Sequence, residues 1–257
     1  NLIEKSITKK TKAIMPVHWT GRMCDMEKIK KIAKKHNLLI IEDAAQAMGS
    51  YYKNKHAGTY GDISAFSTHP LKNLNAIGDG GFIITNKKKL YEKIKLYRNH
   101  GLKRRDEVEI NGVNSRLDSI QAEILNIRLK KLKQVIKNRN KNIEIYKNLI
   151  SSNNVKIIPP RKNYTDAHVM FITLSKKRDK LQKYLAKKKI QSLVYYKTPL
   201  HLHKATKILG YKKGDFPKAE FLVKNVLSFP HHQHLKKKDI VYVVNSINKF
   251  YKNENSI

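Results

Sequence analysis

Residues 38–86, LLIIEDAAQAMGSYYKNKHAGTYGDISAFSTHPLKNLNAIGDGGFIITN, decide the fold. They contain two continuous apolar runs, 38–41 and 63–66; Asp43 follows the first run and a loop with Lys72 follows the second. Continuous apolar runs of this length are typical of strands that are buried on both faces of a parallel sheet. Ligands of such sheets bind at the carboxyl ends of the strands, so we expect Asp43 and Lys72 to lie at one edge of the sheet.

The residues before this stretch complete a βαβ unit. An apolar run at 13–17 predicts a strand, and Asp25 can cap a helix over 26–36 whose apolar residues recur at helical spacing. Because residues 38–41 follow after a short link, the three elements form a right-handed crossover between parallel strands. We therefore expect an α/β protein with a mainly parallel sheet.

The rest of the chain indicates two domains. Residues 117–150 contain no proline or glycine and predict one long helix, and Pro159 and Pro160 mark a boundary. We expect a large domain at 1–150 that ends in this connecting helix, and a small C-terminal α/β domain at 151–257. Further expected elements are a helix from residue 87, an exposed loop at 100–111, strands at 169–174 and 190–196, and helices at 179–188, 217–227 and 239–250.

The composition describes a folded and strongly basic chain. Its 257 residues are 40% hydrophobic, which suffices for a core, and no apolar span is long enough for a membrane helix or a signal peptide. The net charge of +34 comes from lysines spread along the whole chain without a recognition motif, which favours solvated faces over a nucleic-acid function. Cys24 is the only cysteine, which excludes an intrachain disulfide and a cysteine-based zinc site. We expect a cytoplasmic protein, and because the chain starts at Asn1 we expect its front end to be absent.

Lys72 differs from the many other lysines in its position. It follows Pro70 and precedes a glycine-rich stretch, on a loop after a buried strand and outside any amphipathic pattern. A lysine amine condenses with the aldehyde of pyridoxal phosphate (PLP), and an acid, here Asp43, pairs with the pyridine nitrogen so that the ring withdraws electrons. The other interpretation is that Asp43 and Gln46 form a capping box at the start of a helix. The local sequence leaves both interpretations open.

Two histidine clusters, PLHLH and PHHQH, raise the question of a metal site. No acidic residue accompanies either cluster at ligand spacing, so we expect no metal. The histidines concerned are His201, His203, His231, His232 and His234.

Four motifs follow one another along the chain: IIEDAAQAMGS, GDISAFSTHPLKN, GDGGFIITN and GVNSRLDSIQAEIL. Together with VHWTGRMCDM before them and LSFPHHQHL near the end, they resemble the sugar aminotransferases of the DegT/DnrJ/EryC1/StrS family over nearly the whole chain. The resemblance implies the fold-type I architecture of PLP-dependent aminotransferases, PLP as cofactor, and a homodimer that shares its active sites across the interface. It also implies that the N-terminal part of a typical relative, which completes the large domain and the phosphate site, is missing.

The resemblance assigns roles to five residues through these motifs. Lys72 would bind the cofactor aldehyde and move the proton between cofactor and sugar. Asp43 would pair with the ring nitrogen, Gln46 would lie against the ring and its phenolic oxygen, and Ser67 would bind the phosphate. Asn114 would reach the phosphate held by the neighbouring subunit. Taken alone, Ser67 would be interpreted as a turn hydroxyl and Asn114 as a loop cap.

The activity that the resemblance implies is amino transfer. The amino group would pass from an amino acid, with glutamate as the expected donor, to the keto group of a nucleotide-linked deoxysugar. Relatives that remove a hydroxyl carry histidine in place of the lysine, so Lys72 favours amino transfer. His201, in the PLH segment, is the candidate for contact with the sugar. Two alternatives stay open: a PLP-dependent dehydratase or isomerising relative, and a truncated, non-catalytic fragment whose charge binds polyanions.

Overall fold

The computed structural model describes residues 2–254, and the chain forms two compact units. The first unit consists of Asn1–Ile136 and Arg161–Val169, and the second of Lys137–Pro160 and Met170–Ile257. This division differs from the expected boundary at residue 150, because the chain leaves the first unit within a helix and later returns to it. The return segment contains only nine residues, 161–169, but it supports the candidate site described below.

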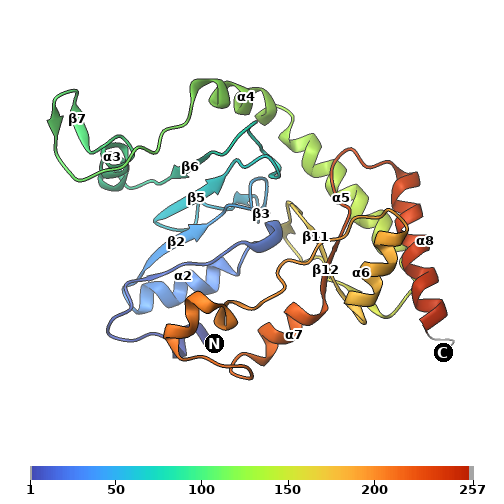
Figure 1. Ribbon diagram of the computed structural model, residues 1–257. Helices are drawn as coiled ribbons and strands as arrows, with labels where there is room; N and C mark the ends of the chain where they lie inside the picture. Colours follow the sequence, from blue (N-terminus) through green and yellow to red (C-terminus); the bar gives the residue numbers. More distant parts are fainter. Residues whose placement is uncertain (1, 255–257) are drawn as a thin grey trace. The chain divides into compact units, whose positions relative to one another are not determined.

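The first unit is built on a four-stranded sheet in the order β1-β2-β5-β6 (Figure 1). β1 and β2 are parallel, β2 and β5 are parallel, and β5 and β6 are antiparallel. The bounds are β1 Ala13–Ile14, β2 Leu39–Asp43, β5 Ile63–Ser67 and β6 Gly81–Ile84. The expected mainly parallel α/β sheet is therefore confirmed.

Helix α2 (Met26–Lys35) is the crossover between β1 and β2. The side chain of Asp25 accepts a hydrogen bond from the Lys28 amide, as expected of an N-cap. Along α2, Met26, Ile29 and Ala33 are buried while the lysines between them face solvent. These side chains join a core with residues of β2 and β5, and this packing holds the two parallel strands beneath the helix.

A second, small sheet brings the return segment into the first unit. Its strands are β3 (Tyr51–Tyr52), β4 (Lys55–His56) and β10 (Tyr164–Thr165), all antiparallel, in the order β10-β3-β4. The rings of Tyr52 and Tyr164 stack with their centroids 4.4 Å apart. Two short helices also belong to this unit, α1 (Leu2–Lys5) and the 3-10 helix η1 (Trp19–Gly21).

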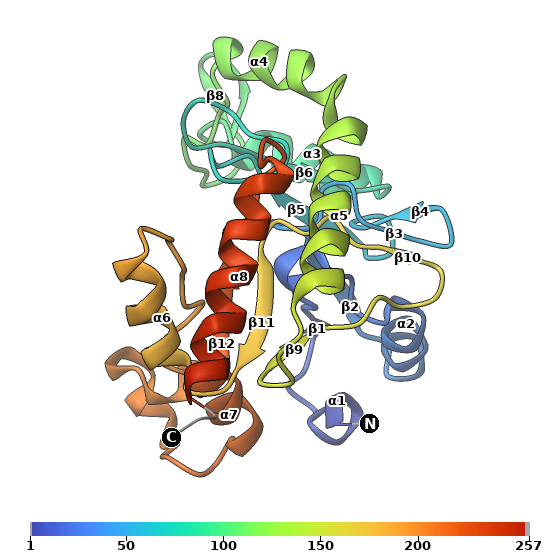
Figure 2. The same ribbon diagram turned by 90° about the vertical axis from the view of Figure 1, so that its right-hand side faces the viewer.

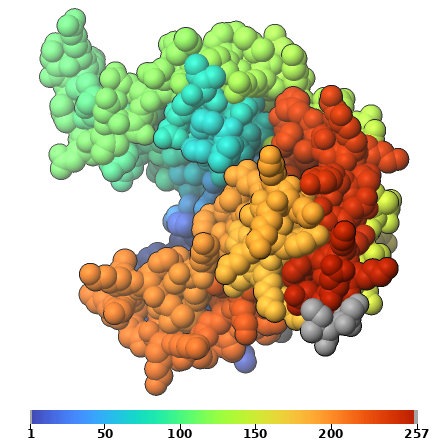
Figure 3. All heavy atoms as spheres, turned by 45° about the vertical axis from the view of Figure 1, so that its right-hand side comes forward, coloured from blue at the N-terminus to red at the C-terminus, as the bar shows by residue number. Residues whose placement is uncertain are grey.

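The segment after β6 extends away from the sheet of the first unit. It begins with α3 (Lys88–Tyr97), and in the space-filling view its green tip protrudes (Figure 3). The loop expected at 100–111 is instead an exposed two-stranded ribbon of β7 (Leu102–Arg104) and β8 (Glu107–Val108).

The prediction of a single helix at 117–150 is wrong. Two helices occupy this range, α4 (Ser119–Leu129) and α5 (Leu132–Leu149). Between them the Lys131 amide donates to the Arg128 carbonyl, a bond three residues back that tightens the turn. The Arg128 guanidinium donates to the carbonyls of Asn75 and Ala76, at 2.7 and 3.2 Å, and so fixes the end of α4. No local sequence signal marks this break.

The second unit is a three-stranded antiparallel sheet, ordered β12-β11-β9, with helices packed on it (Figures 1 and 2). Its strands are β9 Val155–Ile157, β11 Phe171–Ser175 and β12 Val226–Phe229. Its helices are α6 Arg178–Lys187, α7 Pro217–Asn225 and α8 Lys237–Glu254, with the 3-10 helices η2 Leu200–Leu202 and η3 Lys204–Leu209.

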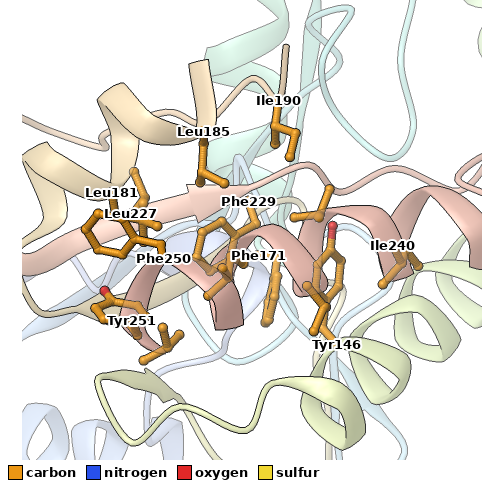
Figure 4. Packing of buried hydrophobic residues seen from close by; sticks show 14 of the residues in the cluster. Tyr146, Phe171, Leu181, Leu185, Ile190, Leu227, Phe229, Ile240, Phe250 and Tyr251 are labelled. Carbon is orange, nitrogen blue, oxygen red and sulfur yellow. The ribbon is translucent and has the colours of Figure 1, made fainter. Parts of the chain in front are cut away.

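The strand expected at 190–196 is wrong, because only Leu193 forms an isolated bridge, to Ser228. The Ser192 carbonyl accepts a bond from the Gln182 side chain instead of from a neighbouring strand. The core of this unit gathers aromatic residues around Tyr146, whose hydroxyl donates to the Pro230 carbonyl at 2.8 Å (Figure 4). None of the helices between residues 2 and 254 is long and apolar enough to span a bilayer.

Candidate active site

Asp43 lies at the carboxyl end of β2, as the sequence predicted. Its Oδ1 accepts from the Ala45 amide at 3.1 Å, and its main-chain carbonyl accepts from the His18 amide at 3.0 Å. Residues 44–50 form turns rather than a helix, and Gln46 does not bond back to Asp43. The capping-box interpretation is therefore wrong, and the half-buried Asp43 carboxylate keeps further capacity to accept.

Gln46 is held by a residue far away in the sequence. Its Oε1 accepts from the Thr20 amide at 2.5 Å, which fixes the orientation of the side-chain amide and leaves its NH₂ group to donate elsewhere. The return segment in turn holds η1, which contains Thr20. The Ala167 amide donates to the Gly21 carbonyl and the Val169 amide to the Thr20 carbonyl, both at 3.0 Å. The position of Gln46 therefore depends on three segments of the first unit.

A buried carboxylate anchors the return segment. Asp166 pairs with Arg22 at 2.9 Å and with Arg161 at 3.0 Å, and its side chain is almost fully buried. Arg161 also donates to the Met23 carbonyl at 2.6 Å and covers the ring of Tyr164. This cluster was not predicted from the sequence, because Arg22 and Met23 lie more than 130 residues before Arg161 and Asp166 and no local motif joins the two segments.

Lys72 lies on the loop after β5 and is half-buried. Its amide donates to the His69 carbonyl, and the Ala76 amide closes the loop onto the Thr68 carbonyl, both at 2.8 Å. Burial lowers the pKa of the Lys72 amine below its ordinary value, and the charge of Asp43 offsets only part of this shift. The structure therefore brings these two groups within electrostatic reach, with an amine that loses its proton more readily than a surface lysine.

Ser67 shares a face of the sheet with Asp43. Asp43 pairs in register with Ala65, and Ser67 lies two residues further along β5, so their side chains leave the sheet on the same side. The Ser67 hydroxyl oxygen accepts from the His69 amide at 3.3 Å, which is the turn contact that the simpler interpretation anticipated. Its proton remains available for a ligand, so the two interpretations are compatible.

A buried histidine–carboxylate pair on the opposite face of β2 from Asp43 was also not predicted from the sequence. His18 Nε2 lies 2.8 Å from Glu42 Oε2, and both side chains are fully buried. Glu42 also accepts from the amides of Gly58, Tyr60 and Gly61. Burial alone would raise the pKa of Glu42, but the bonds from His18 and these amides outweigh it and hold the pKa below its ordinary value. The sequence did contain a signal for the burial of Glu42: side chains alternate along a strand, so the residue next to Asp43 points to the opposite face of the sheet.

Two other predicted residues belong to different segments of the chain. Asn114 is exposed in the first unit, and its side-chain oxygen accepts from Arg116 Nε at 3.0 Å. His201 belongs to the second unit, where it is buried, with Nε2 bonded to Glu220 at 3.1 Å and its ring against Phe216. Between residues 2 and 254, no three His, Cys, Asp or Glu side chains gather in a way that could hold a metal ion.

The groups at this edge of the sheet are an amine, a carboxylate, a hydroxyl and an amide NH₂. Residues 1–248 match the DegT/DnrJ/EryC1/StrS aminotransferase family. The chain belongs to this family. Members of the family are PLP-dependent aminotransferases of fold type I, so the expected fold and cofactor are confirmed. The four groups fit PLP, which offers an aldehyde, a pyridine nitrogen, a phosphate and a phenolic oxygen.

Individual members of the DegT/DnrJ/EryC1/StrS family match the chain closely. A pleiotropic regulatory protein of Geobacillus stearothermophilus is 42% identical over 97% of this chain and 68% of its own length. The dTDP-3-amino-3,6-dideoxy-alpha-D-galactopyranose transaminase of Aneurinibacillus thermoaerophilus is 40% identical over 96% of this chain and 68% of its own. The crystal structure of S. venezuelae DesV in complex with a ketimine intermediate superposes with a TM-score of 0.93 at 33% identity, over 97% of this chain and 67% of DesV. The chain thus spans about two thirds of the length of these relatives.

Proposed function

We propose that this chain, with PLP bound, transfers an amino group from an amino acid to the keto group of a nucleotide-linked deoxysugar. Glutamate is the donor that we propose. The observation that carries the proposal is the half-buried Lys72, whose pKa is lowered by burial and which lies within reach of the Asp43 charge. A relative that is 40% identical is named as a transaminase of a dTDP-linked aminosugar, which supports this substrate class.

Four side chains of the first unit would hold the cofactor. Lys72 takes the aldehyde, Asp43 the pyridine nitrogen, Ser67 the phosphate and Gln46 the phenolic oxygen. When bound, PLP supplies the carbonyl that exchanges nitrogen and a ring that takes up the electrons of a departing proton.

The chain's own groups divide the remaining work. Lys72, once its amine is free and unprotonated, accepts a proton from the carbon of the amino donor and later returns a proton to the sugar carbon. The Asp43 carboxylate would keep the proton on the ring nitrogen, because an opposite charge nearby favours the charged form. The Gln46 NH₂ group would donate to the phenolic oxygen, since Thr20 already holds its carbonyl oxygen.

The residue at position 72 separates amino transfer from the related dehydration. A lysine amine with a lowered pKa can both bond to an aldehyde and carry a proton, whereas a histidine at this position could only carry a proton. Lys72 therefore favours the transaminase over the dehydratase.

We also propose a homodimer in which each subunit contributes to its partner's site. The exposed position of Asn114, held by Arg116, supports this arrangement because the side chain is accessible to a second subunit. We place the reaction in the cytoplasm, in keeping with a chain whose single cysteine is free.

The test is to incubate the PLP-loaded protein with glutamate and a ketosugar nucleotide and to identify the products by mass. We expect an aminosugar nucleotide and 2-oxoglutarate, and neither from the Lys72→Ala variant. A deoxygenated sugar without nitrogen would indicate the dehydratase instead. Failure to take up PLP, together with salt-dependent retention on DNA, would indicate a polyanion-binding fragment.

A further inference from the structure

The two adjacent acids of β2, Glu42 and Asp43, point to opposite faces of the sheet. Asp43 is half-buried on the face that it shares with Ser67, whereas Glu42 is fully buried on the other. This separation follows from the alternation of side chains along a strand. Glu42 is therefore placed directly behind the carboxylate that faces the cofactor, without being able to contact the cofactor itself.

Glu42 receives four hydrogen-bond donors. Three are the main-chain amides of the 58–61 turn, at 2.8, 2.7 and 2.5 Å. The fourth is His18 Nε2 at 2.8 Å. The Ser64 hydroxyl lies 3.4 Å from Glu42 but donates its proton to the Gly58 carbonyl at 2.6 Å. A buried carboxylate that is surrounded by donors stays ionised and rigid, because each donor would lose its partner if the side chain moved.

His18 connects this carboxylate to Asp43 through two of its groups. Its Nδ1 accepts from the Cys24 amide at 3.1 Å, so the ring proton lies on Nε2 and is donated to Glu42. Its main-chain amide donates to the Asp43 carbonyl at 3.0 Å, and Val17 beside it forms a bridge to Asp43. His18 therefore bonds to two successive residues at the end of β2: to Glu42 through its side chain and to Asp43 through its backbone.

We propose that His18 and Glu42 are positioning residues that hold the Asp43 carboxylate in register with the cofactor ring. This inference rests on the proposed function, in which Asp43 pairs with the ring nitrogen. Partners behind a ligating group set its orientation, and losing one typically reduces affinity or activity about tenfold to a hundredfold in the well-studied case of metal sites. A carboxylate that must be placed within about 0.5 Å depends on such support.

His18→Asn and His18→Gln form a matched pair of variants. The amide of asparagine lies near the Nδ1 position of histidine and can still accept from Cys24, but it does not reach Glu42. The amide of glutamine lies near Nε2 and can donate to Glu42. We expect His18→Asn to weaken PLP binding, measured by equilibrium dialysis, about tenfold, and His18→Gln to stay within about threefold of the wild type.

The decisive measurement is a double-mutant cycle with Asp43→Asn. If His18 acts through Asp43, adding His18→Asn to Asp43→Asn will change PLP affinity by no more than about twofold, which is the usual error of additivity. The full tenfold loss in the Asp43→Asn background would overturn the inference, because His18 would then act without Asp43. The absorption spectrum of bound PLP should likewise change in His18→Asn and not change further in the double variant.

Two further results keep this test separate from the proposed function and from folding. If Asp43→Asn alone leaves PLP affinity and the PLP spectrum unchanged, the cofactor role of Asp43 is wrong and the proposed function fails first. If His18→Asn does not fold, Glu42→Asp takes its place in the cycle, since the shorter side chain cannot reach both His18 and the 58–61 turn. The same criterion of non-additivity with Asp43→Asn then supports or overturns the inference.

Discussion

Replacing Glu42 by glutamine should destabilise the first unit far more than its isosteric shape suggests. Oε1 of Glu42 accepts from the amides of Tyr60 and Gly61, and Oε2 accepts from Gly58 and from His18. Every one of these contacts requires an acceptor, whereas glutamine offers one oxygen and one NH₂ group.

The magnitude follows from the orientations that glutamine can adopt. With its NH₂ group at the Oε1 position, the amides of Tyr60 and Gly61 both lose their acceptor. With the NH₂ group at the Oε2 position, Gly58 loses its acceptor, and His18 must accept at Nε2, which displaces the Cys24 amide from Nδ1. Either orientation leaves two buried donors unpaired, at about 1–3 kcal/mol each, so the free energy of unfolding should fall by about 2–6 kcal/mol.

The assay is urea unfolding followed by the fluorescence of Trp19, the only tryptophan, which lies in the first unit and reports on it. Glu27→Gln is the matched control, because it makes the same chemical change in the same unit. Glu27 is exposed, and its side chain bonds to Tyr52 and Lys53 in the part of the chain that the structure describes. The control should unfold close to the wild type, because exposed ion pairs contribute little.

The effect should also depend on pH. The pKa of Glu42 is lower in the folded protein than its ordinary value, so the charged side chain stabilises the fold above the unfolded pKa of about 4.3. This stabilisation is lost as the pH falls through the folded pKa, and the gap between wild type and Glu42→Gln should shrink there. A gap below about 1 kcal/mol at pH 7 would refute the account of Glu42 as a saturated acceptor.

Three further predictions concern the cofactor. Borohydride reduction of the PLP-loaded protein should fix the cofactor on Lys72, seen as a mass increase on its peptide, and Lys72→Arg should abolish the adduct because a guanidinium does not condense with the aldehyde. The rate at which Lys72 binds PLP should rise with pH around a midpoint below 10.5, because burial lowers the pKa of Lys72. Asp43→Asn should move this midpoint lower still, since the Asp43 charge raises the pKa of Lys72. Stopped-flow absorbance measures both rates. If subunits share sites, mixing Lys72→Ala with Asn114→Ala, each inactive alone, should restore roughly a quarter of the wild-type aminosugar production through random pairing, whereas no recovery would exclude the shared site.

The sequence predicted the sheet edge because each part of it has a local signal. The apolar run before Asp43 and the run before Lys72 mark buried strands, and α2 between the first two strands implies that they are parallel. The choice between ring partner and capping box was not local. The capping box is ruled out by Thr20, whose amide takes the Gln46 oxygen from 26 residues earlier in the chain, and the ring-partner role of Asp43 stays a proposal.

The errors in the prediction of the fold have the same origin. Residues 117–150 satisfy every local rule for one helix, yet Arg128 bonds to carbonyls more than fifty residues away, and the helix breaks beside it. Residues 190–196 have strand composition, but the Gln182 side chain takes the Ser192 carbonyl. In both cases a side-chain hydrogen bond to a main-chain carbonyl ten or more residues away accompanies the departure from the local preference.

The two adjacent acids of β2 show how one strand serves structure and chemistry together. A carboxylate offers about four acceptor sites, and Glu42, with four donors, has none left for a ligand. The Asp43 carboxylate accepts only from Ala45 among the residues that the structure describes, so it retains sites for a ring N–H. Strand alternation keeps the two roles on opposite faces, and His18 connects them through its backbone. If His18 positions Asp43 through this backbone bond, a substitution of His18 on the buried face should lower PLP affinity on the opposite face. It should do so only while Asp43 is present.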